Sequence, residues 1–324
     1  MSLLVTGGAG YIGSVIVERL VEKDYQVIVL DNLQTGHREA VHPAAHFILG
    51  DLADSAFLES VFKNHQIKAV IHLAAKSIVE ESVKDPALYF RANLVCGLNL
   101  LEAMRPNGAG KLIFSSTAAV YGEPKTVPIN EDAETDPTNP YGLSKLMFEQ
   151  ILKAYSKAYG LKFVSLRYFN AAGASERNGP DQPGLTHLIP RALKVALGQR
   201  ETLGVYGTDY PTADGTAVRD YIHVRDLAEA HILALGLDRA AAIYNLGHEE
   251  GYSVKEVIEM ARKVTGCEIP VVESPRRSGD PAVLVASSSK IKRELGWRPN
   301  HSDLREIIRS AWQWHQKYPR GYGL

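Results

Sequence analysis

The amino-acid sequence predicts an α/β protein in which a doubly wound parallel sheet is followed by a smaller C-terminal α/β domain. Short β-branched runs alternate with longer helical patterns through the first half, and a glycine-rich turn joins the first strand to the first helix. Strands that alternate with helices imply βαβ units, whose right-handed crossovers build a parallel sheet with helices on both faces. The pattern changes after residue 170, so we expect domains at 1–170 and 171–324, with part of 220–247 returning to the first domain.

The strands and helices of the first half follow from the period of their apolar residues. Each expected strand is a short apolar run with Gly, Pro, Asn or Asp beside it. The expected strands are Leu3–Thr6, Gln26–Leu30, His46–Leu49, Ala69–His72, Lys111–Ser115 and Lys162–Tyr168. The expected helices are Ile12–Glu22, Ser55–Asn64, Pro86–Met104 and Tyr141–Tyr159.

The second half begins with a long connection and continues with helical patterns. Residues 170–184 are rich in Gly, Pro, Asn and Ala, which favours irregular structure. Ser253 is followed three residues later by Glu256, the spacing of a capping box, which fixes the start of one helix. The expected helices are Thr186–Leu197, Val224–Leu237, Val254–Val264, Ser288–Leu295 and Asp303–Lys317.

The composition excludes several classes of protein. Among 324 residues, 36 are Lys or Arg and 37 are Asp or Glu, so the net charge of −1 gives no electrostatic footprint for nucleic acid. No apolar run approaches the roughly 18 residues of a membrane span, and the N-terminus lacks the pattern of a secretion signal. The two cysteines, Cys96 and Cys267, lie far apart without metal-ligand spacing, which predicts a cytoplasmic protein with no metal site.

Two of the expected helices carry more apolar residues than one sheet face requires. The helix over 86–104 is apolar around most of its circumference, and the helix over 141–159 has apolar residues on two sides. A helix that covers one face of a sheet needs a single apolar stripe. We therefore expect a homodimer through these two helices, with cover by the second domain as the alternative.

A candidate nucleotide site lies at the turn between the first strand and the first helix. Gly7, Gly10 and Gly13 allow a tight turn, a close approach of backbone to a pyrophosphate, and close packing of helix on strand. The N-terminus of the helix that follows attracts the negative charge. Asp31 ends the second strand 18 residues after Gly13, where its carboxylate can accept hydrogen bonds from an adenosine ribose.

The surroundings of Asp31 indicate which dinucleotide binds. A 2′-phosphate would meet its negative charge, and the next residues are Asn32 and Leu33 rather than an arginine. This favours NAD over NADP. Asp51 follows the third strand and can hold the adenine edge; the alternative is that it simply begins a helix as its N-terminal aspartate.

A second constellation, Tyr141 and Lys145, stands at the start of the helix after Pro140. The spacing of four residues puts both side chains on one face of the helix. A phenol of pKa about 10 is a poor base near neutral pH, and lowering that pKa by roughly three units requires about 4 kcal/mol in favour of the phenolate. The Lys145 ammonium and a nearby nicotinamide ring would supply this stabilisation.

With these residues in place, the chain resembles the extended short-chain dehydrogenase/reductase family, whose fold is Rossmann-type, and within it the NAD-dependent epimerase/dehydratase group. The resemblance covers nearly the whole chain, and the motifs of the second half are the more specific. The segments that carry it are 6–13 (TGGAGYIG), 30–33 (LDNL), 72–75 (HLAA), 115–122 (SSTAAVYG), 139–145 (NPYGLSK), 167–170 (RYFN), 209–216 (DYPTADGT), 218–224 (VRDYIHV) and 276–280 (RRSGD).

The resemblance implies roles for individual residues. By resemblance Tyr141 is the catalytic base, Lys145 binds the nicotinamide ribose and tunes Tyr141, and Thr117 hydrogen-bonds the sugar 4-oxygen. The NAD contacts that it implies are Gly7, Gly10, Tyr11, Ile12, Gly13, Asp31, Asn32, Thr35, Gly36, Asp51, Leu52, Leu73, Ala74, Ala75, Lys76, Asn93, Ser115, Tyr141, Lys145, Tyr168 and Phe169. The implied substrate contacts are Lys76, Thr117, Tyr141, Asn170, His187, Leu188, Gly204, Val205, Tyr206, Arg219, Tyr221, Arg277, Asp280 and Leu284.

The implied reaction interconverts UDP-glucose and UDP-galactose by inversion at C4 through a 4-keto sugar, in galactose metabolism. Dehydratases that resemble this chain carry Asp-Glu directly after the catalytic Thr, whereas Ala118 and Ala119 stand here, so a dehydratase or decarboxylase is the weaker alternative. A UDP-glucuronate 4-epimerase and a non-catalytic NAD-binding sensor are further alternatives. Leu284, which is smaller than the tyrosine of some relatives, predicts some turnover of UDP-N-acetylglucosamine.

Overall fold

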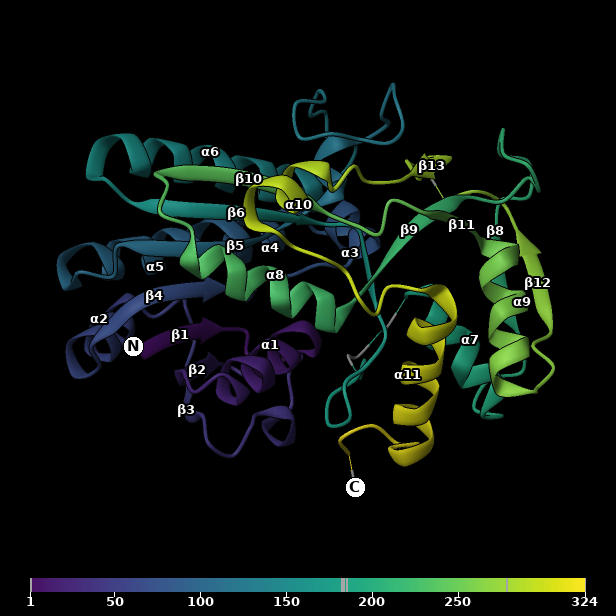
Figure 1. The fold of residues 1–324 in the computed structure, drawn as a ribbon, viewed down its shortest axis with the longest axis horizontal. Helices are drawn as coiled ribbons and strands as arrows, with labels where there is room; N and C mark the ends of the chain where they lie inside the picture. The colour runs from purple at the N-terminus through teal and green to yellow at the C-terminus, as the bar shows by residue number, and fades with distance from the viewer. Residues whose placement is uncertain (1, 182–183, 185, 278, 324) are drawn as a thin grey trace. The chain divides into compact units, whose positions relative to one another are not determined.

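The computed structural model describes residues 2–181, 184, 186–277 and 279–323 and divides into two compact units (Figure 1). The first unit comprises the chain up to residue 122 together with 134–167 and 228–244. The second comprises 123–133, 168–227 and the chain from 245 onward. The stretch 228–244 lies inside the segment that the sequence predicts to return to the first domain. The stretch 123–133 belongs to the second unit, which no local pattern predicted.

The first unit is built on a sheet that runs in the order β10-β6-β5-β4-β1-β2-β3 (Figure 1). The pairings of β1 with β2 and β4, of β2 with β3 and of β4 with β5 are parallel, and the predicted α/β fold with a large parallel sheet is confirmed. Its strands are β1 (Ser2–Thr6), β2 (Gln26–Asp31), β3 (His46–Leu49), β4 (Ile67–His72), β5 (Lys111–Thr117), β6 (Lys162–Tyr168) and β10 (Ala241–Leu246).

Helices connect these strands, and the expected ones other than that over 86–104 are present with small changes at their ends. They are α1 (Tyr11–Glu22), α2 (Ser55–Asn64), α3 (Val79–Lys84), α4 (Pro86–Phe90), α5 (Cys96–Met104), α6 (Pro140–Tyr159) and α8 (Val224–Gly236). Short turns of other helix types are η1 (Arg38–Ala40), η2 (Arg91–Val95), η3 (Arg105–Asn107) and η4 (Ala118–Tyr121).

The single helix predicted over 86–104 is wrong in one respect. It is interrupted by η2, a π-helical turn between α4 and α5. Asn93 lies in this interruption. Its side-chain oxygen accepts a hydrogen bond from the Lys76 amide, and its side-chain nitrogen donates one to the Ser144 hydroxyl. A π-turn within an α-helix often marks such a position, and periodicity alone does not reveal it. Helix α3 was also missed, because six residues are too few for an apolar period.

Alternate residues of the sheet face two layers of helices, as expected for doubly wound strands. One face packs against α2, α5 and α6, and its core includes Leu4, Ile28, Leu30, Leu58, Phe62, Val70, Leu100, Leu112, Phe114, Phe148 and Phe163. On the other face, a Cβ at Gly8 would lie 2.8 Å from the Val29 side chain of β2 and 3.3 Å from the Val17 side chain of α1. Arg19 of α1 and Glu229 of α8 form an ion pair that joins these two helices.

The described part of the second unit contains smaller sheets and the helices given below. Strand β9 (Val218–His223) pairs with β7 (Asn170–Ala172), β11 (Gly251–Ser253) and β13 (Val283–Leu284), and β8 (Leu203–Tyr206) pairs with β12 (Val271–Ser274). The helices are α7 (Leu188–Ala196), α9 (Val254–Thr265), α10 (Ser289–Leu295) and α11 (Leu304–Lys317). A second core joins α7, α9 and α11 to β8 and β9. The predicted capping box of Ser253 and Glu256 is confirmed.

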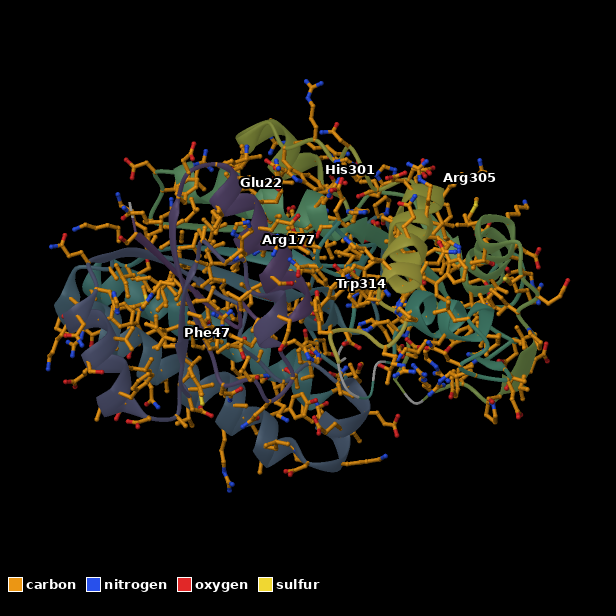
Figure 2. All side chains as sticks on the ribbon, turned by 90° about the horizontal axis from the view of Figure 1, so that it is seen from below. Glu22, Phe47, Arg177, His301, Arg305 and Trp314 are labelled. Carbon is orange, nitrogen blue, oxygen red and sulfur yellow. The ribbon has the colours of Figure 1, made fainter. Side chains whose placement is uncertain are left out.

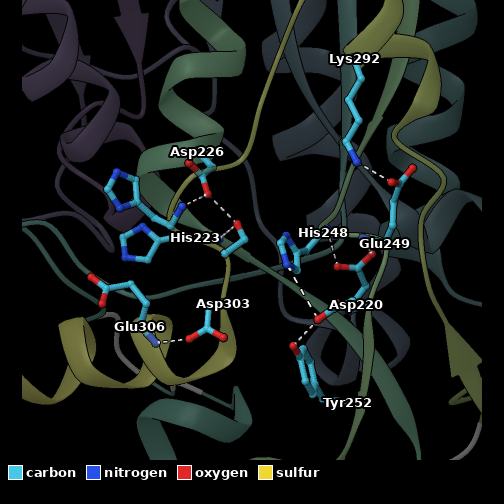
Figure 3. Close-up of polar contacts among 12 residues, drawn as sticks. Asp220, His223, Asp226, His248, Glu249, Tyr252, Lys292, Asp303 and Glu306 are labelled. Carbon is cyan, nitrogen blue, oxygen red and sulfur yellow. Dashed lines mark hydrogen bonds and ion pairs between the residues drawn. The ribbon is translucent and has the colours of Figure 1, made fainter.

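Loops of the second unit are fixed by buried polar side chains. The Asp226 carboxylate accepts hydrogen bonds from the amides of Asn300 and His301 and from the Ser302 hydroxyl (Figure 3). Near the C-terminus, Trp314 of α11 donates its indole N–H to the Arg177 carbonyl (Figure 2). The long connection predicted over 170–184 contains only β7 as regular structure in its described part; residues 182 and 183 lie outside the described residues.

Three further findings concern the described part of the chain. Within it, no helix combines the length and the apolar character needed to cross a membrane. Among the same residues, His, Cys, Asp and Glu side chains form no group of three that could hold a metal ion. Cys96 and Cys267 are both free thiols.

Candidate active site

The glycine turn after β1 leaves the first turn of α1 open to an anion. Gly7 has φ +74°, a conformation that favours glycine, and a Cβ there would lie 2.6 Å from the Ala74 nitrogen. A Cβ at Gly13 would lie 2.2 Å from the Gly7 carbonyl oxygen, so the turn and the helix pack too closely for any side chain. Gly10 caps α1 without a side-chain hydrogen bond, and no acidic residue stands in the first turn. This cradle of backbone amides fits a pyrophosphate.

Asp31 is held in place at the end of β2 by two backbone amides. Its Oδ2 accepts from the Ala9 amide at 3.0 Å, and its Oδ1 accepts from the Leu33 amide at 2.9 Å. Each carboxylate oxygen keeps a second lone pair, so both can still accept from ribose hydroxyls. The carboxylate thus lies against the glycine turn, as the sequence predicts for a residue that reads the ribose.

Asp51 does not begin the following helix, so the structural alternative for this residue is wrong. The N-cap of α2 is Asp54, whose side chain accepts from the Phe57 amide. The Asp51 carboxylate accepts instead from the Asn32 side chain at 2.8 Å. Asp51 and Asn32 therefore form one polar pair, and the role of this pair at the adenine edge stays a prediction.

Two loops flank the glycine turn. Gly36 lies against Ala9, and the next residue, His37, donates its amide to the Ala9 carbonyl, which brings the predicted Thr35–Gly36 segment to the turn. On the other side, the amides of Leu73 and Ala74 both donate to the Thr6 carbonyl. The remaining predicted NAD contacts of this unit are Tyr11 and Ile12 in the first turn of α1, Leu52 after β3, Ala75 and Lys76 after β4, and Ser115 in β5.

Asn93 ties the loop after β4 to the helix that carries the predicted base. Its Nδ2 donates to the Lys76 carbonyl at 3.0 Å and to the Ser144 hydroxyl at 2.9 Å, and its Oδ1 accepts from the Lys76 amide. Ser144 in turn donates to the Tyr141 carbonyl. The side chain that the sequence assigned to the cofactor is thus also a structural link between these two segments.

Thr117, Tyr141 and Lys145 meet where β5 ends and α6 begins. Asn139 caps α6 through the Gly142 amide and Pro140 takes the first helical position, so the helix starts one residue before Tyr141. The Thr117 and Tyr141 side chains are hydrogen-bonded to each other. The Lys145 ammonium donates to the Ser115 carbonyl at 2.9 Å. The structure therefore brings the three predicted catalytic residues together.

Burial determines the electrostatics of these groups in the chain alone. It raises the pKa of Tyr141, and the hydrogen bond from Thr117 opposes this effect. Burial lowers the pKa of Lys145 to about 7, with the Glu149 carboxylate acting in the opposite direction. The expected lowering of the Tyr141 pKa is thus not a property of the chain by itself, because desolvation of the phenolate outweighs the hydrogen bond.

In the second unit, the structure pairs several predicted substrate residues with one another. Arg219 of β9 forms an ion pair with Asp280. Arg219 also stands opposite Leu284 in the β9–β13 register, and Tyr221 stands opposite Asn170 in the β7–β9 register. These residues come from three separate stretches of sequence, and strand pairing alone makes them neighbours.

A cationic cluster surrounds Tyr206 at the end of β8. The guanidinium carbon of Arg277 lies 4.0 Å from the centre of the Tyr206 ring, and that of Arg191 lies 5.8 Å from it. Hydrogen bonds from both arginines lower the pKa of the Tyr206 phenol. His187 caps α7 without a side-chain hydrogen bond, and burial with the nearby Arg277 charge lowers its pKa. Two cations beside a helix N-terminus suit a phosphate.

Arg191 is the residue that sequence reasoning missed. It lies one helical turn after His187 on α7, a spacing of four residues that would have placed it on the same face. Its Nε is buried and, within the described part of the chain, finds no hydrogen-bond partner. Such a donor next to two other polar groups fits an anionic ligand.

The geometry agrees with what comparison with known proteins finds. The family model described as the NAD dependent epimerase/dehydratase family matches residues 3–247. The chain belongs to this family. The extended short-chain dehydrogenase/reductase resemblance predicted from the motifs is thereby confirmed.

Relatives in this family match the chain from end to end. A UDP-glucose 4-epimerase of Lacticaseibacillus casei is 53% identical over 328 residues, which cover 100% of this chain and 99% of that protein. The crystal structure of a UDP-glucose 4-epimerase from Bifidobacterium longum in complex with NAD⁺ and UDP is 41% identical, with TM-score 0.96 over 99% of this chain and 100% of that one. The Brucella ovis enzyme in complex with NAD is 44% identical, with TM-score 0.93 over 96% and 97%.

The predicted NAD contacts of this family member are divided between the two units. Those up to Lys145 belong to the first, whereas Tyr168 and Phe169 open the second at the end of β6. Both aromatic side chains are buried, and the Phe169 amide donates to the Leu246 carbonyl. The uncapped helix, the glycine cradle and the braced Asp31 in the first unit form a donor and acceptor set that fits NAD. The individual contacts remain predictions.

Proposed function

We propose that this protein is an NAD-dependent isomerase, a UDP-glucose 4-epimerase, that inverts C4 of UDP-glucose and UDP-galactose. The observation that carries the proposal is the hydrogen-bonded pair of Thr117 and Tyr141 with Lys145 one helical turn away, in the unit that contains the glycine cradle. Membership of the family and end-to-end identity with curated 4-epimerases support it.

The chain's own groups account for the proton that leaves the 4-hydroxyl. The glycine cradle and Asp31 would hold NAD⁺, which when bound would supply the hydride acceptor and donor for C4. Tyr141 takes the hydroxyl proton as phenolate, and Thr117 holds the oxygen through a hydrogen bond. Because burial disfavours the phenolate, the Lys145 ammonium is the stabilising charge that the chain provides. Loss of this proton together with the C4 hydride would leave a 4-keto sugar, and Tyr141 would return the proton to the oxygen when C4 regains a hydride on its other face.

The diphosphate of the substrate would be held by the second unit. Arg277, Arg191 and the N-terminus of α7 offer charge and backbone donors, and Arg219 supplies a further guanidinium. Such a clamp on the phosphates leaves the hexose free to turn over between the two hydride transfers. The remaining assigned contacts, Lys76, Leu188, Gly204 and Val205, belong to this proposal.

Other fates of a 4-keto sugar are less well supported by the residues present. A dehydratase needs a proton donor close to C5 and C6, and the two positions after Thr117 are Ala118 and Ala119 in η4. A protein that only senses NAD does not require a phenol paired with a lysine, because it transfers no proton. Epimerisation requires only the reversal of the first step.

One observation favours a second substrate, UDP-N-acetylglucosamine. Leu284 is only partly buried and lies beside Arg219 in the paired strands, where a tyrosine would project a larger and polar side chain. We predict measurable turnover of UDP-N-acetylglucosamine, and a Leu284→Tyr variant should lose it about tenfold relative to UDP-galactose, because bulk near the 2-substituent is repelled. Equal loss for both sugars would contradict this assignment.

A homodimer and a cytoplasmic location complete the proposal. Val83, Val95, Leu143 and Met147 on α3, η2 and α6 are exposed apolar side chains, and α3 and η2 both pack against α6. This apolar surface supports the predicted dimer through helices 86–104 and 141–159, and Leu143→Glu with Met147→Glu should shift the mass in solution to that of a monomer. The two free thiols support a reducing compartment.

The direct test is a panel of UDP-hexoses incubated with the purified chain and NAD⁺. We expect UDP-galactose to reach equilibrium with UDP-glucose without net consumption of NAD⁺. A stable 4-keto-6-deoxy product would identify a dehydratase instead. NAD binding without any change in the sugars would identify a sensor.

A further inference from the structure

A buried network of four side chains lies behind the predicted catalytic residues and has no part in the mechanism described so far. Its centre is the ion pair of Glu149 on α6 and Arg167 on β6. The guanidinium is bidentate: Nε donates to Oε1 at 3.0 Å and Nη2 donates to Oε2 at 2.6 Å. The Glu149 side chain is fully buried and that of Arg167 is 4% exposed. A buried charge pair of this kind gives little net stability, so its geometry is the more informative feature.

The network holds the chain on both sides of Thr117. Immediately before it, the Ser116 hydroxyl donates to Glu149 Oε1 at 2.6 Å. Shortly after it, in η4, the Tyr121 hydroxyl accepts from Arg167 Nη1 at 2.8 Å. The segment that presents Thr117 is therefore fixed at one end by the carboxylate and at the other by the guanidinium.

The same carboxylate lies on the helix that carries the catalytic pair. Glu149 follows Lys145 by four residues and Tyr141 by eight, so the three side chains share one face of α6. Lys145 itself donates to the carbonyl of Ser115, the neighbour of Ser116. The Glu149 contact to Ser116 and the Lys145 contact to Ser115 thus fasten α6 to two successive residues of β5.

His72 of β4 and Glu149 of the same helix interact electrostatically with the Lys145 ammonium. The Arg167 guanidinium of β6 is paired with Glu149. Burial lowers the pKa of His72 to about 3, so this ring is neutral in the physiological range. Glu149 is therefore the anion that favours the ammonium form of Lys145, and Arg167 partly offsets it.

We propose that Glu149 and Arg167 are positioning residues that align Thr117 with Tyr141 and help Lys145 to keep its proton. They act through Ser116, Tyr121 and the shared helix face and touch neither cofactor nor substrate. The inference rests on the proposed 4-epimerase function for its kinetic readout. It accounts for a buried ion pair at a place where two apolar side chains would fill the same space.

The first arm of the test changes the charge with Glu149→Gln. The variant loses the anion and leaves the Arg167 cation unpaired, and both changes disfavour the Lys145 ammonium. We expect kcat for UDP-galactose to fall about tenfold or more with KM within about threefold. The alkaline limb of the kcat profile should move down by roughly one pH unit, because Lys145 then loses its proton at lower pH. An unmoved alkaline limb in a folded variant would overturn the proposal.

Asp226→Asn is the matched control for the first arm. It also removes a buried charge, but among the described residues the Asp226 carboxylate accepts from Asn300, His301 and Ser302, all in the second unit. The melting temperature should fall for both variants, whereas the pH profile of kcat should move only for Glu149→Gln. If the pH profiles of kcat moved equally in the two variants, the role of the Glu149–Arg167 network would be purely structural.

The second arm, Ser116→Ala, keeps all charges and avoids the risk that the first variant does not fold. It breaks the bond between Glu149 and the residue before Thr117, and we expect kcat to fall about threefold to tenfold with KM unchanged. Ser165→Ala is its control, since Ser165 is a buried serine of β6 whose hydroxyl finds no partner among the described residues. If the two serine variants had identical kcat values, the proposed alignment of Thr117 through Ser116 would be refuted.

A spectroscopic readout separates failure of this inference from failure of the proposed function. The titration of the Lys145 ammonium is followed by NMR of lysine labelled with ¹⁵N, with Lys145→Met identifying its signal, without any turnover. Glu149→Gln should lower the pKa of this ammonium, because the neighbouring carboxylate is lost and Arg167 is left unpaired. This shift in the variant, with no conversion of UDP-hexose by the wild-type chain, would refute the function alone, and an unchanged titration would refute the network alone.

Discussion

The predicted catalytic residues of the first unit and the predicted substrate-binding arginines of the second unit have different surroundings. In the first unit they are desolvated: Lys145 is 4% exposed and its pKa falls to about 7, and burial raises the pKa of Tyr141. In the second unit the arginines are already neutralised or stacked, Arg219 on Asp280 and Arg277 on the Tyr206 ring. Desolvation shifts proton affinities, whereas prepared cations bind anions. The first unit is thus suited to chemistry and the second to holding a charged ligand.

The largest expected effect tests the first side of this comparison. Tyr141→Phe removes the proton acceptor, so kcat should fall by roughly three orders of magnitude while NAD content and melting temperature stay close to those of the parent. Steady-state rates and the absorbance of bound cofactor measure this. Tyr155→Phe, on the same helix and hydrogen-bonded to Glu102, is the control and should retain the parental rate. A Tyr141→Phe rate within tenfold of the parent would assign the base elsewhere.

The second side is tested by Arg277→Ala, which should raise KM for UDP-galactose about tenfold to a hundredfold with a smaller change in kcat. The reason is the loss of a charged donor to a phosphate, worth about 1.5–3 kcal/mol. Initial rates over a range of substrate concentrations measure the two constants. Arg293→Ala, at an exposed position of α10, should leave both unchanged. If kcat fell by as much as kcat/KM, the division of roles between the units would be refuted.

Asp31→Ala tests a second role within the first unit, because Asp31 is predicted to bind the ribose of NAD rather than to take part in the reaction. Loss of its carboxylate should reduce the preference for NAD over NADP about tenfold, since the 2′-phosphate no longer meets a negative charge. Dissociation constants for both dinucleotides provide the measurement, with Asp54→Ala at the N-cap of α2 as the control for lost stability. Unchanged discrimination would mean that the ribose is read by another residue.

The smallest expected effect is a loss of folding stability at acid pH, to which buried histidines of both units contribute. Burial lowers the pKa of His72 and His223 to about 3 and that of His315 to about 4. Only the unfolded chain then binds these protons near pH 6, so their contribution to stability is complete above about pH 6.5 and is lost as the pH falls toward 4. The melting temperature should decline over this range. His72→Asn should flatten the decline; an equally steep curve would remove His72 as a cause.

Local sequence patterns predicted strands β1 to β6 and most helices of the first unit, but not β10. The glycine turn, Asp31, and the Tyr141–Lys145 pair are each contiguous or tied to a strand end, so spacing alone carries their positions. The π-turn at Asn93 and the assignment of 123–133 to the second unit depend on contacts with distant residues. The Glu149–Arg167 pair becomes visible only when folding brings separate segments together, whereas Arg191 could have been found from its four-residue spacing to His187. Burial, which sets the pKa of Tyr141, is likewise a tertiary property.

The interleaving of the two units has a consequence for synthesis on the ribosome. The chain passes between them after residues 122, 133, 167, 227 and 244, so neither unit corresponds to one continuous stretch of translated sequence. β10, at the edge of the larger sheet, ends at Leu246, well after most of its partners have emerged. A gene truncated at any of these crossings would therefore encode an incomplete unit. Neither half can be produced alone by simple deletion, and a nicked or split version would need both fragments to fold together.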